Sequence, residues 1–342
     1  MFKSWSARLA FVAVAAMPSA GCADGLTNPL LEAGPVPLVA TPVPLWPGDP
    51  SRTALGALDF RGGVELDGAG VGFGGISALA LDADGTGFLA LSDIGFWVTG
   101  RLVFEDGRLA GVADAVAGRL RDRDGAPVDR ALRDAEALAV VGDGTVAVAF
   151  EREHRVWAYA PDAAGGLSGV PTPMPMPPGL AAAARNDGLE ALARLADGRW
   201  VGIAQDLADA DGRMGWIGSG PPHAIDWQPF RYAAADGFDV ADAAALPGGD
   251  LLVLERSIGL LTGARARLVH VPAAALRPGA VTAGTELAWL APPLTVDNFE
   301  AVAVARRAEG TVILIASDDN FQPFQRSLLL AFLWPNSPPQ RP

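Results

Sequence analysis

The sequence of 342 residues has almost none of several residue types that many catalytic sites use. Lys3 is its only lysine, so the rest of the chain offers no amine for Schiff-base or general-base chemistry. Cys22 is its only cysteine, which excludes an intramolecular disulfide and a cysteine-based metal cluster. The three histidines, His154, His223 and His270, lie far apart, and none has a partner at the spacing of a zinc motif.

Several motifs are also missing. The sequence contains no GxSxG nucleophile elbow and no glycine-rich loop of the Walker A or Rossmann type. Beyond the N-terminus no stretch of about 18 residues is apolar throughout, so no transmembrane helix is predicted there. The formal net charge is −13, which disfavours binding to nucleic acid or to anionic membranes. It favours cations, or anionic substrates held through a bound cation.

Residues 1–23 have the pattern of an export signal, because two basic residues precede an apolar run at 9–17 that is too short to span a bilayer. Two cleavage sites stay open. Cleavage after Ala23 gives a soluble exported protein, whereas cleavage before Cys22 makes that cysteine the lipidated first residue of a lipoprotein. We therefore expect an exported chain, periplasmic or secreted, that meets a membrane only through a lipid on Cys22.

The dominant pattern is a hairpin that recurs along the chain. At 134–157 the sequence DAEALAVVGDGTVAVAFEREHRVW has two β-rich runs around a glycine turn, with an acid opening the first and another closing the second. Three copies keep steps of 8 and 7 residues, a fourth is slightly shorter and a fifth slightly longer. The copies are Ser77-Gly85-Ser92, Glu136-Gly144-Glu151, Glu190-Gly198-Gln205, Asp242-Gly249-Glu255 and Glu300-Gly310-Ser317.

The first residues of these copies are 52 to 59 residues apart, which leaves room for about four strands per interval. Four-stranded units repeated in this way predict an all-β fold, a β-propeller with antiparallel blades. We expect five blades, with six as the alternative, and a strand at 55–66 that completes the last blade. The propeller should span 52–334, between a proline-rich lead-in at 24–51 and a tail at 335–342. We expect less than about a tenth of the chain to be helical.

The acids of the repeat should gather at one face of this propeller. The first strand of each blade lines the central channel, and the second strand ends beside the point where the first begins. Crowded carboxylates raise one another's pKa, so either a hard cation such as Ca²⁺ or neighbouring arginines must balance them, and both remain open. The candidate metal ligands are Asp93, Glu136, Glu190, Glu255, Glu300, Asp318 and Asp319. The candidate catalytic residues include the glutamates Glu136, Glu190 and Glu300. Arg256 and Arg326 are candidate clamps for an anionic substrate, and His154 is a candidate base or phosphate ligand.

Several segments also match a known pattern: FRGGVEL at 60–66, GGISALALDADGTGFLALSD at 74–93, DAEALAVVGDGTVAVAFE at 134–151, NDGLEALARLADG at 186–198, LVLER at 252–256, and NFEAVAVA with ILIASDDNFQPFQRSLLLAF at 298–305 and 313–332. With these segments the chain resembles the bacterial phytase-like family, whose name refers to the esterase-like activity of phytase. The resemblance covers about residues 52–334. It implies an exported propeller, hydrolysis of phosphoesters or carboxylesters and, by analogy with propeller phytases, dependence on calcium.

Two functions therefore remain open. The first is a hydrolase that acts on a small anionic or ester substrate with a cation held in the funnel. The second is a non-catalytic exported module that binds a small ligand or a partner in the cell envelope. In either case we expect a monomer that does not bind nucleic acid.

Overall fold

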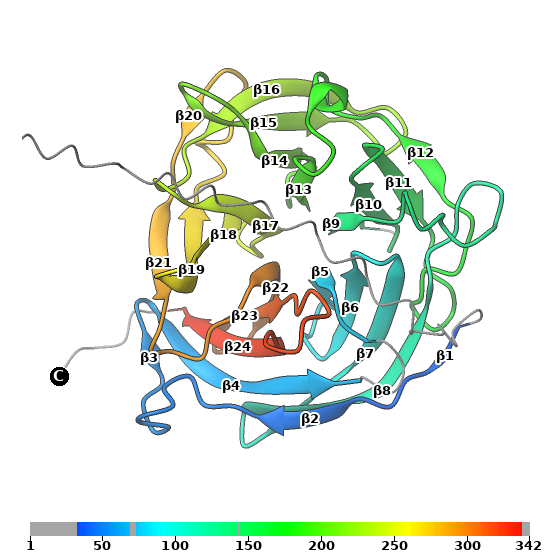
Figure 1. Cartoon of the computed structure of the whole chain (residues 1–342). Coiled ribbons are helices and arrows are strands. Elements are labelled where there is room, and N and C mark those ends of the chain that lie inside the picture. Colours follow the sequence, from blue (N-terminus) through cyan, green and yellow to red (C-terminus); the bar gives the residue numbers. More distant parts are fainter. Residues whose placement is uncertain (1–32, 69–72, 143, 337–342) are drawn as a thin grey trace, which may run out of the picture.

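The computed structural model describes residues 33–68, 73–142 and 144–336, which form a closed ring of five β-sheets around a central axis (Figure 1). The predicted all-β propeller with five blades is confirmed, and the alternative of six blades is wrong. The predicted signal at 1–23, with Cys22, and most of the predicted tail lie outside the described residues. Within the described part of the chain, no helix is long and apolar enough to cross a membrane.

Each blade is an antiparallel sheet whose strands follow one another outward from the axis. The first blade contains β5 (Ile76–Leu81), β6 (Gly87–Ser92), β7 (Phe96–Glu105) and β8 (Arg108–Arg119), with β1 (Gly34–Pro35) at its edge. The second contains β9 (Ala135–Val140), β10 (Val146–Phe150), β11 (Arg155–Tyr159) and β12 (Thr172–Met174). The short 3₁₀-helix η2 (Leu180–Ala182) follows, and it is the only helix among the residues described.

The other three blades complete the circle. The third contains β13 (Leu189–Arg194), β14 (Trp200–Asp209), β15 (Gly212–Ser219) and β16 (Asp226–Tyr232), with β20 (Val281–Thr282) pairing in parallel at its edge. The fourth contains β17 (Asp239–Ala245), β18 (Leu251–Gly259), β19 (Gly263–Val271) and β21 (Thr285–Leu290). The fifth contains β22 (Phe299–Arg307), β23 (Gly310–Ser317), β24 (Ser327–Pro335), β4 (Leu58–Asp67) and β2 (Val39–Pro42), and β3 (Ala54–Leu55) pairs with β4.

The ring closes through strands from both ends of the chain, as predicted. The N-terminal strand β4 pairs antiparallel with β24, so that Leu330 lies opposite Gly63. The proline-rich lead-in takes part as well, because β1 pairs with β8 and β2 pairs with β4. Proline lacks the N–H that a central strand needs, and these segments accordingly lie at sheet edges.

The hydrophobic core is divided among the interfaces between blades. Five buried clusters lie one at each interface between neighbouring sheets. Alanine occupies equivalent buried positions near the start of four inner strands, at Ala78, Ala137, Ala191 and Ala301. Such small side chains let the inner strands approach one another around a narrow axis.

A β-bulge marks the start of each inner strand. In β9, for example, Ala135 lies opposite Phe150 and Ala137 opposite Ala149, which leaves Glu136 as the extra residue. A bulge re-aims a side chain out of the alternation of the strand. The bulged residues of the five blades are Ser77, Glu136, Glu190, Ala241 and Glu300.

The fourth blade corrects one inference from the repeat. The sequence places Asp242 at the level of Glu136, but the strand register assigns that position to Ala241. Asp242 occupies the position that holds an alanine in the other four blades. Its carboxylate accepts hydrogen bonds from the N–H of Ala243 and of Val302, both at 2.7 Å. It therefore links the fourth blade to the fifth. The shorter spacing of the fourth copy came from this shift of one residue.

The two ends of the channel differ in chemistry. The inner strands begin at the end that carries the bulges and their acids. Toward the opposite end they enclose a cavity of about 200 Å³, lined mainly by small and aliphatic residues from all five inner strands. The polar end is the candidate functional site and is called the mouth below.

Candidate functional site

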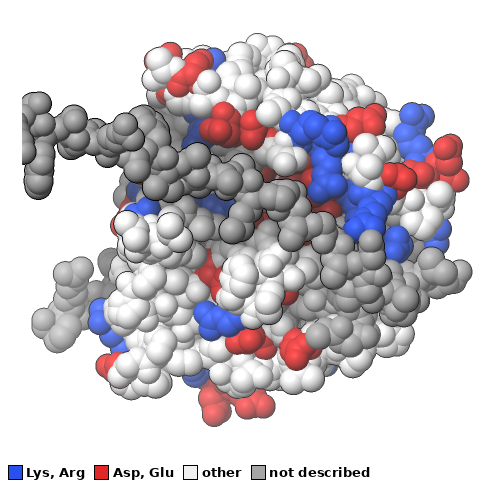
Figure 2. All heavy atoms as spheres, in the orientation of Figure 1, with Lys and Arg blue, Asp and Glu red and all other residues white. Residues whose placement is uncertain are grey.

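A second ring of polar residues lies beside the bulges. In each second strand its member directly follows the residue that pairs with the position before the bulge. Its members are Asp93, Glu151, Gln205, Arg256 and Asp318. Backbone hydrogen bonds keep them in register, because the N–H of Asp93 donates to Gly75 and that of Glu151 donates to Asp134. The structure thus brings the bulge acids and the strand-end acids to one face. In the view of Figure 2, acidic side chains show around the centre of the disc, and basic side chains gather over the second and third blades.

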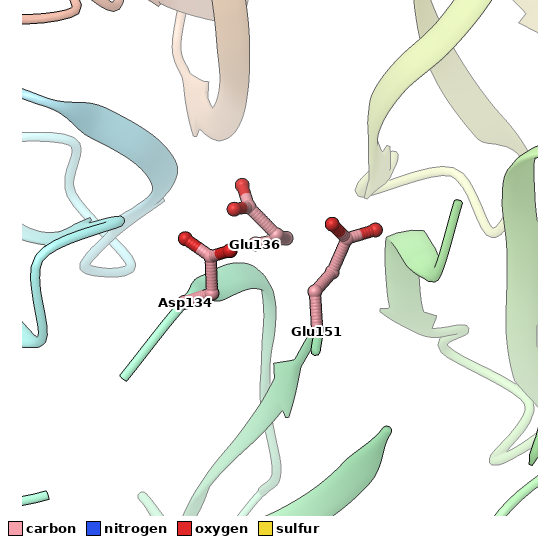
Figure 3. Close-up of side chains that lie close together, drawn as sticks. All are labelled: Asp134, Glu136 and Glu151. Carbon is pink, nitrogen blue, oxygen red and sulfur yellow. The ribbon is translucent and has the colours of Figure 1, made fainter. Parts of the chain in front are cut away.

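The most compact group of carboxylates comes from the second blade. Asp134 precedes β9, Glu136 is the bulge residue, and Glu151 follows β10, and their side chains extend to the same side (Figure 3). One oxygen from each lies within 4.8 Å of the other two. We call these three residues the acidic trio.

Protein groups satisfy the acidic trio only in part. Arg152 places its Nε 2.5 Å from Oδ2 of Asp134, and the N–H of Gly188 donates to Oε1 of Glu151. Among the described residues no donor hydrogen-bonds the carboxylate of Glu136. The trio therefore keeps oxygens that a cation or a proton could neutralise.

The electrostatic environment of the trio disfavours negative charge. Burial raises the pKa of Glu136 well above its ordinary value, and the nearby carboxylates of Glu190, Asp134 and Glu300 raise it further. Burial also raises the pKa of Glu151 to about 7, although the hydrogen bond from Gly188 acts in the opposite direction. Without a cation, these groups hold protons that ordinary glutamates release.

The unneutralised acids extend from the trio into the first and fifth blades. Burial raises the pKa of Asp93 to about 7, and the charges of Asp134 and Glu300 add to this shift more than the guanidinium groups of Arg133 and Arg152 subtract. Burial, with the charges of Glu300 and Asp93, raises the pKa of Asp318 well above its ordinary value.

The other half of the mouth is internally paired around Arg256. Its Nη1 donates to Oδ1 of Asn298 at 2.8 Å and forms an ion pair with Glu300. Glu300 also accepts from Nδ2 of Asn298 at 2.6 Å. The neighbours fix the orientation of the Gln205 amide, whose nitrogen donates to Glu190 at 2.9 Å while its oxygen accepts from Nη2 of Arg256 at 3.1 Å. We call Glu190, Gln205, Arg256, Asn298 and Glu300 the paired network.

Two residues predicted at the site lie away from its centre. Glu255 stands one position before the ring, and its oxygens accept from the Tyr232 hydroxyl at 2.7 Å and from Nη1 of Arg267 at 2.6 Å. The guanidinium of Arg326 contacts Oδ2 of Asp297 at 3.4 Å and the carbonyl of Val296 at 3.1 Å. Both side chains are engaged in contacts that join neighbouring segments.

Asp319 and His154 border the mouth. The carboxylate of Asp319 accepts from the N–H of Gly75 at 3.0 Å and from the Ser327 hydroxyl at 2.9 Å, so it ties the first blade to the loop before β24. His154 places Nε2 3.0 Å from the carbonyl of Ala184. Its Nδ1 is buried without a hydrogen-bond partner among the described residues.

The predicted ligand set omitted three residues that the structure places at the centre. Asp134 and Asn298 each stand two residues before a bulge glutamate, so extending the repeat by two positions would have found them. Glu151 was recognised as the end of a hairpin but was not chosen as a ligand. Only the three-dimensional register shows that Glu151, and not Glu255, shares the level of Asp93.

Together these features define a five-bladed propeller with an acidic mouth. The model of the phytase-like family, described as esterase-like activity of phytase, matches residues 71–321, and the chain belongs to this family. The search of curated proteins found no match.

Solved structures with a similar chain course are distant in sequence. A gluconolactonase from Xanthomonas campestris is 13% identical with a TM-score of 0.40, and the match covers 90% of this chain and 99% of that one. The PQQ-bound aldose sugar dehydrogenase from Streptomyces coelicolor is 13% identical with a TM-score of 0.41, covering 87% and 99%. The Malassezia sympodialis allergen Mala s 1 is 12% identical with a TM-score of 0.41, covering 80% and 88%. Likenesses at this level carry no argument about activity.

Proposed function

We propose that the protein is an exported hydrolase of small phosphoesters or carboxylesters that works with a divalent cation, calcium being the first candidate, at the acidic trio. The observation that carries this proposal is the convergence of Asp134, Glu136 and Glu151 within 4.8 Å. Membership of the phytase-like family supports the reaction class, and the N-terminal sequence supports export. Fractionation of cells that express the full chain tests the export.

The donor set of the trio fits a hard cation. Ca²⁺ binds six to eight oxygens at roughly 2.3–2.6 Å, so two of its ligands can stand up to about 5 Å apart. The oxygens of the trio lie within that limit. Three carboxylates leave coordination positions for water and substrate, and a bound calcium would polarise a phosphoryl or carbonyl oxygen and lower the pKa of a bound water.

The protein groups around the trio have separate tasks in this proposal. Arg152, which contacts Asp134, supplies positive charge close to an incoming anionic substrate. Burial raises the pKa of Glu136 and of Glu151, so a cation that binds them must displace protons from these carboxyl groups. If Nε2 of His154 donates to the carbonyl of Ala184, its Nδ1 is a hydrogen-bond acceptor close to Gly188, the residue that donates to Glu151. Arg256 keeps Glu300 in place, since its donors already have partners.

The test compares the unchanged chain with Glu136→Gln and with the matched control Glu309→Gln, which alters an exposed acid outside the mouth. Each protein is assayed on phytate, aryl phosphates and aryl esters, with calcium and with a chelator. We expect calcium-dependent turnover that Glu136→Gln reduces by about 100-fold or more and that Glu309→Gln retains. Calcium at 100 times its Kd should also stabilise the unchanged chain by about 2.7 kcal/mol, but not the Glu136→Gln variant. Turnover that is equal in both variants would exclude this site.

A specific observation favours the second candidate, a non-catalytic module that binds a ligand at the mouth. Both predicted anion clamps, Arg256 and Arg326, are occupied by carboxylates of the protein. A binding module predicts the same calcium-dependent stabilisation, lost in Glu136→Gln, together with no turnover of any substrate. The two readouts of the same experiment therefore separate the candidates.

A further inference from the structure

The hairpin between β18 and β19 ends in an apolar tip that nothing in the described structure covers. Leu260 and Leu261 are 102% and 98% exposed, and Ile258 is 61% exposed. No charged residue lies between Arg256 and Arg265, so the tip is uncharged over eight positions. Three large aliphatic side chains in four consecutive positions form a patch, unlike the single exposed aliphatic residues that are common on protein surfaces.

The tip projects from the mouth face. Arg256 is in the second ring, and β18 continues for three residues beyond it before the turn. At about 3.3 Å per residue, the tip stands roughly 10 Å above that ring. In the neighbouring fifth blade, Phe324 is 78% exposed in the connection between β23 and β24, which begins at the ring residue Asp318 and so lies at the same end of the strands. Exposed apolar side chains from two adjacent blades therefore lie in connections at the same side of the disc.

The corresponding hairpin of the third blade has the opposite character. At the end of β14 and in the turn to β15 the chain carries Asp209 and Asp211, and Arg231 pairs with Asp209. Such a tip is solvated without a partner. The β18–β19 tip lacks charge although the whole chain has a formal net charge of −13. An uncharged apolar tip favours an apolar partner, and the net negative charge of the chain disfavours a negatively charged one.

We propose that the mouth face docks on a neutral lipid surface, with Leu260 and Leu261 inserted among the acyl chains and Phe324 making a second contact. Exposed apolar side chains at two separate places on one face can contact an extended surface together, whereas a small ligand would reach only one of them. Moving a leucine side chain from water into acyl chains is favourable, and two or three such side chains are enough for reversible attachment. The net negative charge favours zwitterionic over anionic lipid. This docking is independent of hydrolysis and would present the mouth to the membrane. It adds a direct contact to the one expected through a lipid on Cys22.

Flotation with phosphatidylcholine vesicles tests the proposal. All arms use the full chain with Cys22→Ala, so that no acyl group at this position contributes. The variant Leu260→Asp/Leu261→Asp is compared with the control Val39→Asp/Val281→Asp, which adds the same charge on the exposed outer strands β2 and β20. We expect the vesicle partition coefficient to fall by about tenfold or more in the tip variant and to stay within about twofold in the control.

Four outcomes would overturn the proposal. They are absence of binding by the parent chain, equal binding by the tip variant, an equal loss in the control, and binding that needs anionic lipid and disappears with salt. Sedimentation velocity without lipid covers the alternative of a second copy, and self-association that the tip variant abolishes would also overturn the proposal. The hydrolysis of soluble substrates is measured in parallel. Because the tip variant leaves the acidic trio intact, failure of docking and failure of the proposed activity are distinguishable.

Discussion

The two halves of the mouth carry side chains at equivalent positions of the same repeat, yet they differ in how completely protein groups pair their carboxylates. Even in the paired network, burial and the charge of Glu151 raise the pKa of Glu190 well above its ordinary value. In the paired network, Arg256 and Gln205 occupy second-ring positions and engage Glu300 and Glu190. In the second blade the equivalent position is Glu151, which adds a charge to those of Asp134 and Glu136. The fold sets where the side chains meet, and the residue at one position per blade decides whether protein groups pair the carboxylates there or leave some of their oxygens open.

The two halves should also differ in what they do for stability. The paired network is a set of buried charges that depend on one guanidinium, so its removal leaves carboxylates without a partner. The carboxylates of the trio repel one another, so protonation reduces this repulsion, and a bound cation would do the same. The predictions below test this contrast, beginning with the largest effect.

Replacing Arg256 with methionine should cost about 3–5 kcal/mol, because it leaves the mostly buried carboxylate of Glu300 unpaired. Urea unfolding monitored by tryptophan fluorescence measures the change in unfolding free energy. The double variant Arg256→Met/Glu300→Met should recover most of the loss, since it removes both charges. A decrease in unfolding free energy below about 1 kcal/mol in the single variant would mean that Arg256 does not neutralise the carboxylates of the paired network.

The trio should make the calcium-free protein less stable as the pH rises. The folded protein holds a proton on Glu151 up to about pH 7, whereas the unfolded chain releases it near the ordinary pKa of 4.5. Between these values the folded state binds more protons than the unfolded state, so the free energy of unfolding falls with increasing pH. At about 1.4 kcal/mol per pKa unit, the contribution of Glu151 falls by roughly 3 kcal/mol.

Glu151→Gln isolates this contribution, because glutamine does not titrate. The difference in unfolding free energy between the unchanged chain and the variant, measured in chelator from pH 4.5 to 7, should follow the predicted fall. Saturating calcium should weaken the pH dependence, since the cation replaces the proton. A difference that stays constant with pH would contradict the raised pKa.

A smaller and more local effect is expected from Gly188→Ala. A Cβ at this position would stand 2.8 Å from Oε1 of Glu151 and 3.0 Å from Nδ1 of His154, so both side chains must shift. We expect calcium affinity to fall by about tenfold, or about 1.4 kcal/mol, while the paired network stays intact. The control is Gly142→Ala in the turn between β9 and β10 of the second blade, where the added Cβ meets nothing within 4 Å. Equal calcium affinity in both variants would argue against Glu151 as a ligand.

Much of the architecture could be predicted because the same hairpin recurs along the sequence at nearly constant spacing. The steps between anchors, turn glycines and strand ends gave five hairpins, and the short remainder after Glu300 predicted the pairing of β4 with β24. The same period brought Glu136, Glu190 and Glu300 to one level. It failed at Asp242 and Glu255, where a shift of one residue in the strand register turns a side chain to another environment.

The sequence by itself determined the repeat, the number of blades and the acidic character of one end of the channel, because these follow from local strand periodicity and composition. Only the tertiary structure decided which acids face one another, that Asp134 joins Glu136 and Glu151, and that Arg256 is already engaged. The physical reason is that charges interact through distances of a few ångströms between blades. Bulges and register set those distances, and spacing along the chain does not.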